Sequence, residues 1–159
     1  MRRRTRFRLL FNAALSACLV LIVYATSGLT QGEIVAMHAL SHLEAPYVYG
    51  KAGPDSFDCS GLVIHCLKPE DIRLPRSALE IGADGRFRKI DDPGRLMVGD
   101  VLCFDTVRDS DPSDHVGFYL GGGQFVHASS AKGKVVVSDL ADFYLDKFTG
   151  ARRVAQVWF

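Results

Sequence analysis

The chain has 159 residues, enough for one domain with its own core and too few for two. Hydrophobic residues make up 48% and charged residues 23%, a composition typical of a globular protein. The formal charge of +1 is unevenly spread, because the first 25 residues carry five Arg and no acid. The rest of the chain carries 14 Lys and Arg against 18 Asp and Glu, and this net charge of −4 excludes a basic face for nucleic acid.

Residues 1–29 have the pattern of a signal peptide or an N-terminal membrane anchor. The basic residues are followed by a charge-free run from Leu9 to Tyr24. Three alternatives stay open: cleavage after Ala25, retention as a membrane attachment, and lipidation of Cys18 in a lipobox-like sequence. All three predict that the domain, residues 30–159, lies outside the cytoplasm.

The sequence of the domain predicts helices in its first part and strands in its second part. Helices are expected over Glu33–Leu43, from Cys59 to about Leu67, and at a capping box that begins at Ser77, with a polar loop over Gly82–Gly94. The later elements are strands over Val101–Phe104, His115–Leu120, Gln124–Ser129, Val135–Val137 and Ala151–Trp158, with a short helix over Leu140–Phe148. This order predicts an α+β domain whose N-terminal helices pack on one side of an antiparallel sheet.

Two pairs of residues in the domain raise the question of a metal or a disulfide. His38 and His42 are four apart, a spacing that suits a shared metal, but no third ligand stands at a recognised spacing. The sequence therefore favours ordinary helix histidines, and no metal or cofactor is expected. A disulfide between Cys66 and Cys103 is one alternative, but the sequence favours two buried thiols.

The run Asp58-Cys59-Ser60-Gly61 stands directly before an apolar stretch. Asp58 is a good helix N-cap, which places Cys59 in the first turn of the helix. Because the helix dipole and free N–H groups favour an anion there, the Cys59 thiol is expected to ionise below its free value near ~8.5. The alternative is a small, inert buried residue behind a capping Asp.

Two histidines meet on the predicted hairpin around Gly121-Gly122-Gly123. Side chains alternate faces along a strand, so Val116 and its alternate neighbours share the core face and His115 takes the other. An odd-length turn pairs residues whose numbers sum to an even value. His127 therefore lies on the same face as His115, directly opposite or one diagonal step away.

A cysteine at a helix start and a histidine pair on a hairpin are the parts of a nucleophilic site. In this interpretation His115 takes the proton of Cys59 and later gives it to the leaving amine, while His127 fixes the tautomer of His115. Two alternatives stay open on spacing alone: two partly exposed histidines on a polar sheet face, and a zinc site made by the three residues.

Several blocks follow one another along the chain: Tyr47-Val48-Tyr49-Gly50, Phe57-Asp58-Cys59-Ser60-Gly61-Leu62-Val63, Leu74-Pro75-Arg76-Ser77, Gly99-Asp100-Val101, the run Asp114–Gly121 and Phe125-Val126-His127-Ala128-Ser129. In these ordered blocks, the chain from about Glu33 to Val157 resembles the NlpC/P60 family of cell-wall cysteine peptidases. The resemblance implies a papain-like fold and hydrolysis of peptidoglycan stem peptides between D-γ-glutamate and a diamino acid. It also implies export to the bacterial cell envelope, the periplasm or the cell surface.

The resemblance also implies roles for single residues. Cys59 matches the family nucleophile, His115 the base and His127 the orienting residue. Tyr47 matches the tyrosine whose hydroxyl helps the oxyanion, with the Cys59 N–H as its partner.

Asp58 and Ser60 match residues that hold the free amino end of the stem peptide in some members, and Asp58 as a plain helix cap is an equal alternative. The same chemistry would serve an N-acetylmuramoyl-L-alanine amidase or an acyltransferase. A third reading is a non-catalytic module that binds peptidoglycan or a partner protein.

Overall fold

The computed structural model describes residues 28–107 and 113–154. The chain divides into two compact units, Met1–Thr30 and Gln31–Phe159. Among the described residues, no helix has the length and apolar character that a membrane span requires. The predictions for the N-terminal segment fall almost wholly outside the described residues.

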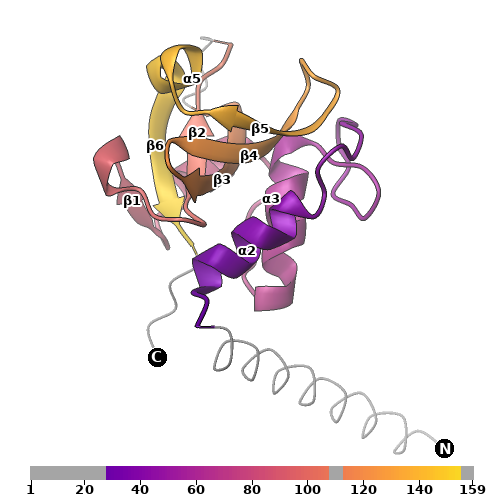
Figure 1. The fold of residues 1–159 in the computed structure, drawn as a ribbon, viewed down its shortest axis with the longest axis horizontal. Coiled ribbons are helices and arrows are strands. Elements are labelled where there is room, and N and C mark those ends of the chain that lie inside the picture. Colours follow the sequence, from indigo (N-terminus) through magenta and orange to yellow (C-terminus); the bar gives the residue numbers. More distant parts are fainter. Residues whose placement is uncertain (1–27, 108–112, 155–159) are drawn as a thin grey trace, which may run out of the picture. The chain divides into compact units, whose positions relative to one another are not determined.

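The second unit is built on one six-stranded sheet in which every neighbouring pair is antiparallel (Figure 1). The strand order is β1 (Arg88–Ile90), β6 (Phe148–Arg153), β2 (Val101–Phe104), β3 (His115–Gly121), β4 (Gln124–Ser129) and β5 (Lys134–Asp139). The α+β fold predicted from the order of elements is confirmed.

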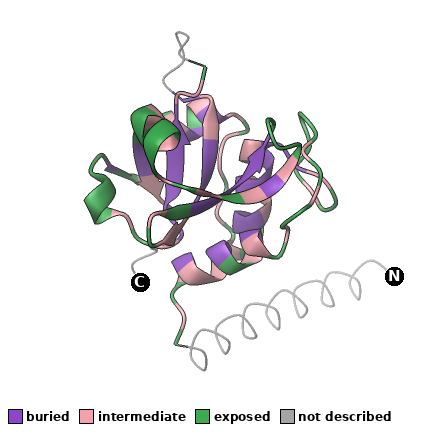
Figure 2. Cartoon of the chain, turned by 45° about the horizontal axis from the view of Figure 1, so that its top comes forward, coloured by how far each residue is buried: buried purple, intermediate pink, exposed green. Residues whose placement is uncertain are grey.

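Three helices of the N-terminal half pack on one face of the sheet: α2 (Gln31–Leu40), α3 (Cys59–Leu67) and α4 (Ala78–Ala83). Short 3-10 turns occupy Lys68–Glu70 and Pro93–Arg95. A cluster of buried hydrophobic residues fills the space between helices and sheet, and Figure 2 shows buried residues on both the helices and the strands. Its largest members are Val35, Phe57, Leu62, Val63, Leu67, Ile81, Val101, Val116, Phe118 and Val126.

The opposite face of the sheet carries a second apolar cluster made by Ile90, Leu102, Phe104, Phe125 and Ala151. Helix α5 (Asp142–Lys147) contributes Tyr144 to it. The N-terminal helices lie on one side of the sheet, as the sequence predicts, but the other side is also covered. Aromatic residues on β2 and β4 provide a second buried surface, and a short C-terminal helix covers part of it.

Two element predictions need correction. The segment Gly82–Gly94, predicted as a loop, contains β1, because pairing with β6 supplies hydrogen bonds that its polar sequence does not announce. The last strand begins at Phe148 and ends at Arg153, so it starts three residues earlier than predicted and ends before the predicted Trp158. The buried, unbridged state of Cys66 and Cys103 is confirmed.

The hairpin of β3 and β4 turns through Gly121, Gly122 and Gly123, all with positive φ. Three successive residues with positive φ favour glycine, because residues with a side chain rarely adopt this backbone conformation. The register shifts between Tyr119 and Gly121, and beyond it Phe118 pairs with Val126. The residue numbers of this pair add to an even value, as the sequence predicts.

Candidate active site

Helix α3 begins at Cys59, directly after the predicted cap Asp58. Asp58 has extended backbone angles, and its Oδ1 accepts a hydrogen bond from the Gly61 N–H at 2.7 Å. Cys59 is therefore the first residue of the helix. The cap fixes the start of α3 against the sheet, because the next turns of the helix lie in the core.

Arg76 holds Asp58 in place from the segment between α3 and α4. Its Nη2 lies 2.5 Å from Oδ2 and its Nη1 lies 3.0 Å from Oδ1 of Asp58, a bidentate ion pair. The same Nη1 donates to Ser60 Oγ at 2.7 Å, and the Gly50 N–H donates to Asp58 Oδ2 at 2.8 Å. Asp58 and Ser60 are thus both buried and both bound to Arg76.

The pKa of Asp58 reflects these contacts. Burial alone would raise the pKa of the carboxyl, but hydrogen bonds from Arg76, Gly61 and Gly50 outweigh burial and hold the pKa below its usual value. Asp58 is therefore an anion at neutral pH. In the sequence, Arg76 stands out only as part of a family block, because no spacing rule links an N-cap to an arginine 18 residues later.

Cys59 lies where α3 meets the beginning of β3. Its Sγ is 4.0 Å from the carbonyl oxygen of Asp114, and the Val116 N–H points to it from β3. Burial raises the pKa of the Cys59 thiol, against the opposing effect of backbone N–H groups of Val116, Ser60 and Cys59 itself. The expectation of a lowered pKa is wrong for this site, because the cost of burying a thiolate exceeds the benefit of the helix N-terminus.

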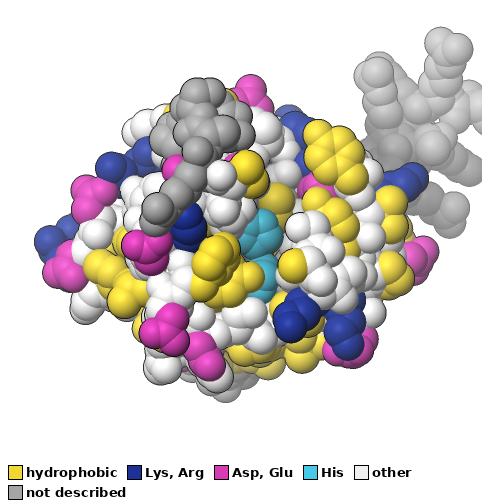
Figure 3. Space-filling model, turned by 90° about the horizontal axis from the view of Figure 1, so that it is seen from above, with side chains coloured by type: hydrophobic (Ala, Val, Ile, Leu, Met, Phe, Trp, Pro, Cys, Tyr) yellow, Lys and Arg dark blue, Asp and Glu magenta, His cyan; other side chains and the backbone are white. Residues whose placement is uncertain are grey.

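The two hairpin histidines form a direct hydrogen bond. His115 Nε2 lies 2.7 Å from His127 Nδ1, and the two rings meet edge to face at 4.8 Å. The Cβ position of Gly117 lies against the Cβ of His127, so His115 is one diagonal step away. The meeting of these histidines on one face is confirmed. In the view of Figure 3 histidine side chains reach the surface in a hollow between hydrophobic side chains.

His127 is fully buried rather than partly exposed on a polar face. Its ring stacks on Phe125 at 4.7 Å and meets Tyr144 edge to face at 5.4 Å. Its Nε2 lies 3.0 Å from Ser138 Oγ on β5. Ser138 in turn bonds to Tyr144, and neither residue carries a sequence pattern that would have revealed this contact.

Burial keeps both imidazoles neutral. It lowers the pKa of His115 to about 4, with a small opposing effect of Asp114. It lowers the pKa of His127 to about 3, with a further lowering by His115. In the substrate-free protein at neutral pH, a thiol and two neutral histidines therefore share this site.

Two tautomer arrangements satisfy these hydrogen bonds, and one of them leaves a free nitrogen on His115. In that arrangement Nε2 of His127 donates to Ser138 Oγ, and Nδ1 of His127 accepts a hydrogen bond from the protonated Nε2 of His115. Nδ1 of His115 then keeps its lone pair. The chain of three side chains thus leaves one unprotonated imidazole nitrogen on His115, the residue that follows the Asp114 carbonyl beside Cys59.

Tyr47 and Asp114 frame this site. Burial raises the pKa of the Tyr47 hydroxyl, and the next contributions come from Cys59 and Asp58, which places all three groups close together. Asp114 receives the N–H groups of Thr106 and Val107 at 2.8 and 2.7 Å. These bonds close the base of the loop before β3 and fix the strand at His115.

The residues that could share a metal ion in the described part of the chain are His38, His42 and Cys66. They lie on α2, just beyond it, and on α3, outside the group around Cys59. The zinc alternative for Cys59, His115 and His127 thus has no support from the positions of their ligand atoms, and the nitrogens between the two histidines are occupied by each other.

Comparison with known proteins gives a consistent result. The family model of the NlpC/P60 family matches residues 44–153. The probable endopeptidase YafL of Escherichia coli K12 is 40% identical over 124 residues, which cover 76% of this chain and 49% of YafL. A gamma-DL-glutamyl hydrolase of Bacillus subtilis is 38% identical over 122 residues, which cover 75% of this chain and 28% of the relative.

Solved structures agree with the curated relatives. NlpC2 from Trichomonas vaginalis superposes with a TM-score of 0.72 at 32% identity, covering 80% of this chain and 48% of that protein. The chain spans about half or less of the length of these relatives. The fold and the family therefore follow from the match, whereas the activities of the longer proteins do not transfer by likeness alone.

Proposed function

The chain belongs to the NlpC/P60 family, and from the site that it carries we propose that it is a cysteine endopeptidase that hydrolyses peptidoglycan stem peptides. The bond that we assign to it joins D-γ-glutamate to a diamino acid. The name of the Bacillus subtilis gamma-DL-glutamyl hydrolase supports a glutamyl bond. The catalytic residues that we assign are Cys59, His115 and His127.

The hydrogen bond between His115 and His127 carries this proposal. It is short, at 2.7 Å, and it lies among buried groups that keep both rings neutral. A neutral histidine whose second nitrogen is already bonded is oriented as a general base. A binding module without catalysis has no use for such a chain of polar groups in an aromatic cluster.

In the proposed reaction, Nδ1 of His115 removes the proton of the Cys59 thiol as Sγ attacks the carbonyl carbon of the scissile amide. The imidazolium then donates this proton to the leaving amine, and a thioester of Cys59 remains. A water molecule, deprotonated by His115, attacks the thioester and releases the carboxylate and the thiol. The burial that raises the pKa of Cys59 makes this base necessary, because little free thiolate exists before the substrate binds.

The developing oxyanion needs hydrogen-bond donors beside Cys59. The Cys59 N–H at the first position of α3 has no partner inside the helix, because the first N–H groups of any helix lack one. We assign the Tyr47 hydroxyl as the second donor. Its raised pKa keeps it protonated at neutral pH, so it can donate.

Asp58 and Ser60 act first as structural partners of Arg76 in this proposal, since Arg76 occupies both of them. Binding of the free amino end of the stem peptide is their second assigned role. Ser60→Ala separates the two: a loss confined to KM for fragments with a free amino end, and absent for acetylated fragments, would support recognition by this group. An equal loss for both kinds of fragment would limit Ser60 to structure.

The envelope is the cellular location that fits this substrate. The Arg-rich start and charge-free run of residues 1–29 provide the export signal or the attachment to a membrane in this proposal. A fusion of residues 1–40 to a reporter enzyme that is active only after export would test it. Activity in whole bacteria supports export, and its absence contradicts it.

Incubation of the full chain with purified peptidoglycan fragments, followed by mass spectrometry of the products, tests the proposed activity. We expect cleavage at the D-glutamyl–diamino-acid bond, and none with Cys59→Ala. Cleavage at the muramyl–alanine bond would make the protein an amidase, and transfer of the acyl group to an added amine would make it an acyltransferase. Binding of the fragments without cleavage by either protein would overturn the proposal in favour of a binding module.

A further inference from the structure

A second group of histidines with a cysteine lies where α2 packs on α3. His38 is in the last turn of α2, His42 follows the helix, and His65 and Cys66 are near the end of α3. The ring centroids of the three histidines are 5.0 to 5.4 Å apart. The proposed hydrolysis uses none of these side chains.

The ligand atoms of three of them already converge. A ring nitrogen of His38, a ring nitrogen of His42 and the Sγ of Cys66 all lie within 4.8 Å of one another. Around a tetrahedral Zn²⁺, with Zn–N near 2.0–2.1 Å and Zn–S near 2.3 Å, ligand atoms are roughly 3.3–3.7 Å apart. The two histidine side chains are only half-buried, so a small rotation of each can close the difference.

His42 has a buried nitrogen that nothing satisfies. Its Nε2 is shielded from solvent and has no hydrogen-bond partner in the structure. Burial of a polar atom without a partner is costly, and native proteins keep few such atoms. A metal ion bound to this nitrogen would remove that cost.

His38 has one ring nitrogen bonded to the backbone. Its Nδ1 lies 3.3 Å from the carbonyl oxygen of Cys66, so this nitrogen carries the proton and the other nitrogen keeps its lone pair. A histidine that donates one N–H to a backbone carbonyl and offers the second nitrogen is the usual arrangement around zinc.

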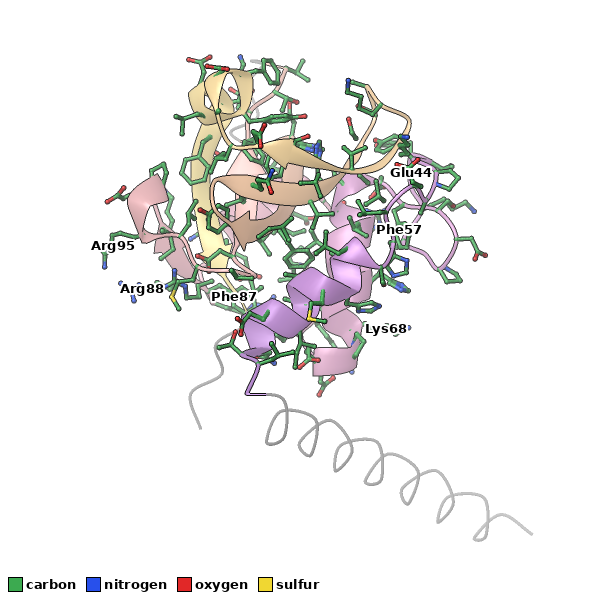
Figure 4. The ribbon with its side chains drawn as sticks, in the orientation of Figure 1. Glu44, Phe57, Lys68, Phe87, Arg88 and Arg95 are labelled. Atoms are coloured by element: carbon green, nitrogen blue, oxygen red, sulfur yellow. The ribbon has the colours of Figure 1, made fainter. Side chains whose placement is uncertain are left out.

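The surroundings bring a third histidine and an aromatic ring to the site. The ring centroid of His65 on α3 lies 5.4 Å from that of His38 and 5.0 Å from that of His42. Phe57, labelled in Figure 4, packs against the rings of His42 and His65 at 4.7 and 5.3 Å and closes the site on one side.

We propose that His38, His42 and Cys66 form a zinc site that joins α2 to α3, with a water molecule in the fourth position. Nitrogen and thiolate ligands together select Zn²⁺ over Mg²⁺ or Ca²⁺, which take oxygen ligands. On binding, the S–H bond of Cys66 breaks, the proton passes to solvent, and the thiolate electron pair forms the bond to zinc. No oxidation or reduction takes place.

The ion has a structural role in this proposal, independent of peptide hydrolysis. It links the end of α2 to the end of α3, the helix whose first residue is Cys59. Because zinc binds the folded protein and the site is absent from the unfolded chain, zinc stabilises the fold by mass action.

The test uses the full chain with Cys18→Ser and Cys59→Ala, so that Cys66 and Cys103 are the remaining thiols. Cobalt(II) serves as a spectroscopic probe, and zinc is then added to displace it. We expect the charge-transfer band of a cobalt thiolate together with the bands of four-coordinate cobalt. At zinc about 100-fold above its dissociation constant, the melting temperature is expected to rise by on the order of 10 °C.

Single substitutions in this background locate the site. Cys66→Ala and His42→Gln are each expected to weaken cobalt binding by at least about 100-fold, since even indirect partners of a metal are worth about 10- to 100-fold. Cys103→Ala, which removes an equally buried thiol on β2, is the matched control and is expected to keep the band. His42→Gln keeps the test decisive if Cys66→Ala fails to fold, because His42 lies outside the core.

The pH dependence provides a second readout. A thiol must lose its proton to bind zinc, so the affinity of the site for zinc is expected to rise about tenfold per pH unit between pH 6 and 8. Absence of the thiolate band and of any shift in melting temperature would overturn the proposal. A band that persists in Cys66→Ala or disappears in Cys103→Ala would overturn it equally.

Discussion

Helix α3 carries a cysteine–histidine group at each end, and the two groups differ in how their nitrogens are used. At its start, Cys59 lies by a histidine pair joined at 2.7 Å, and the far nitrogen of that pair bonds to Ser138. At its end, Cys66 lies by histidines whose rings are about 5 Å apart and one of whose nitrogens has no partner. Imidazole nitrogens that are hydrogen-bonded to each other suit proton transfer, whereas an imidazole nitrogen without a hydrogen-bond partner suits a metal ion.

The difference comes from the elements that hold each group. A β-hairpin fixes His115 and His127 through its register, so their separation is fixed by the backbone. The end of α2 holds His38 and His42 through helix packing, and these half-buried side chains keep freedom to rotate. In the two proposals, the same residue types thus support different chemistries in one small domain.

Substitution of His115, the proposed general base on the hairpin, should produce the largest difference between the two groups. We expect His115→Ala to lower kcat/KM for peptidoglycan fragments by about 10³-fold or more, because it removes the general base. His65→Gln, at the other end of α3, is the control and is expected to keep the activity. Similar losses in both variants, with both proteins folded, would contradict the assignment of His115.

Acid should weaken the fold through the buried histidines. The folded-state pKa values of His115 and His127, about 4 and about 3, lie below the value of 6.5 for an exposed histidine. Their contribution to stability is therefore complete above pH 6.5 and is lost as pH falls toward 4, by a few kcal/mol in total.

Denaturant titrations at pH 7.5 and pH 5 measure this effect. The variant His127→Asn removes one of the two groups and is expected to lose less stability than the parent between these pH values. For the enzyme reaction, the acid limb of kcat/KM is expected near pH 4, where His115 takes up a proton. An acid limb at pH 6.5 would show an exposed base instead.

Loss of Arg76 should loosen the Cys59 end of α3 without touching the Cys66 end. We expect Arg76→Ala to lower the free energy of unfolding by about 1–3 kcal/mol, because it leaves a buried carboxylate with fewer partners. The exposed pair Lys89–Asp91 provides the control, and Lys89→Ala is expected to change stability by about 0–1 kcal/mol. Equal effects of the two substitutions in urea titrations would show that Asp58 does not depend on Arg76.

Substitution of Ser138 should have the smallest effect among the four predictions. Ser138→Ala removes the hydroxyl partner of His127 Nε2, one hydrogen bond away from the proposed base His115, and is expected to lower kcat/KM about fivefold to tenfold. Ser41→Ala, whose hydroxyl bonds to the His38 carbonyl, is the matched control at the other end of α3. An unchanged activity in Ser138→Ala would show that aromatic packing alone orients His127.

Local patterns were sufficient for much of the molecule. The capping Asp58 predicts the first residue of α3, and the capping box at Ser77 predicts α4, because a cap acts within one helical turn. Alternation along two strands and a glycine turn predict that His115 and His127 meet, because side chains repeat every two residues. The ordered blocks predict the family, which the match over residues 44–153 confirms.

Other features depend on segments that are distant in the sequence and meet only in the folded chain. Arg76 reaches Asp58 and Ser138 reaches His127 through packing that no local pattern encodes. Strand β1 exists because β6 pairs with it. The pKa of Cys59 is opposite in direction to the expectation from its helix position, since burial is a property of the whole fold.

The sequence by itself determined which residues carry the proposed chemistry and which secondary structure holds them, because caps, turns and side-chain alternation act over a few residues. Only the tertiary structure decided how those residues are charged, what orients them, and that Cys66 lies beside His38 and His42. Burial and contact between distant segments set these properties, and both arise only when α2, α3 and the sheet pack together.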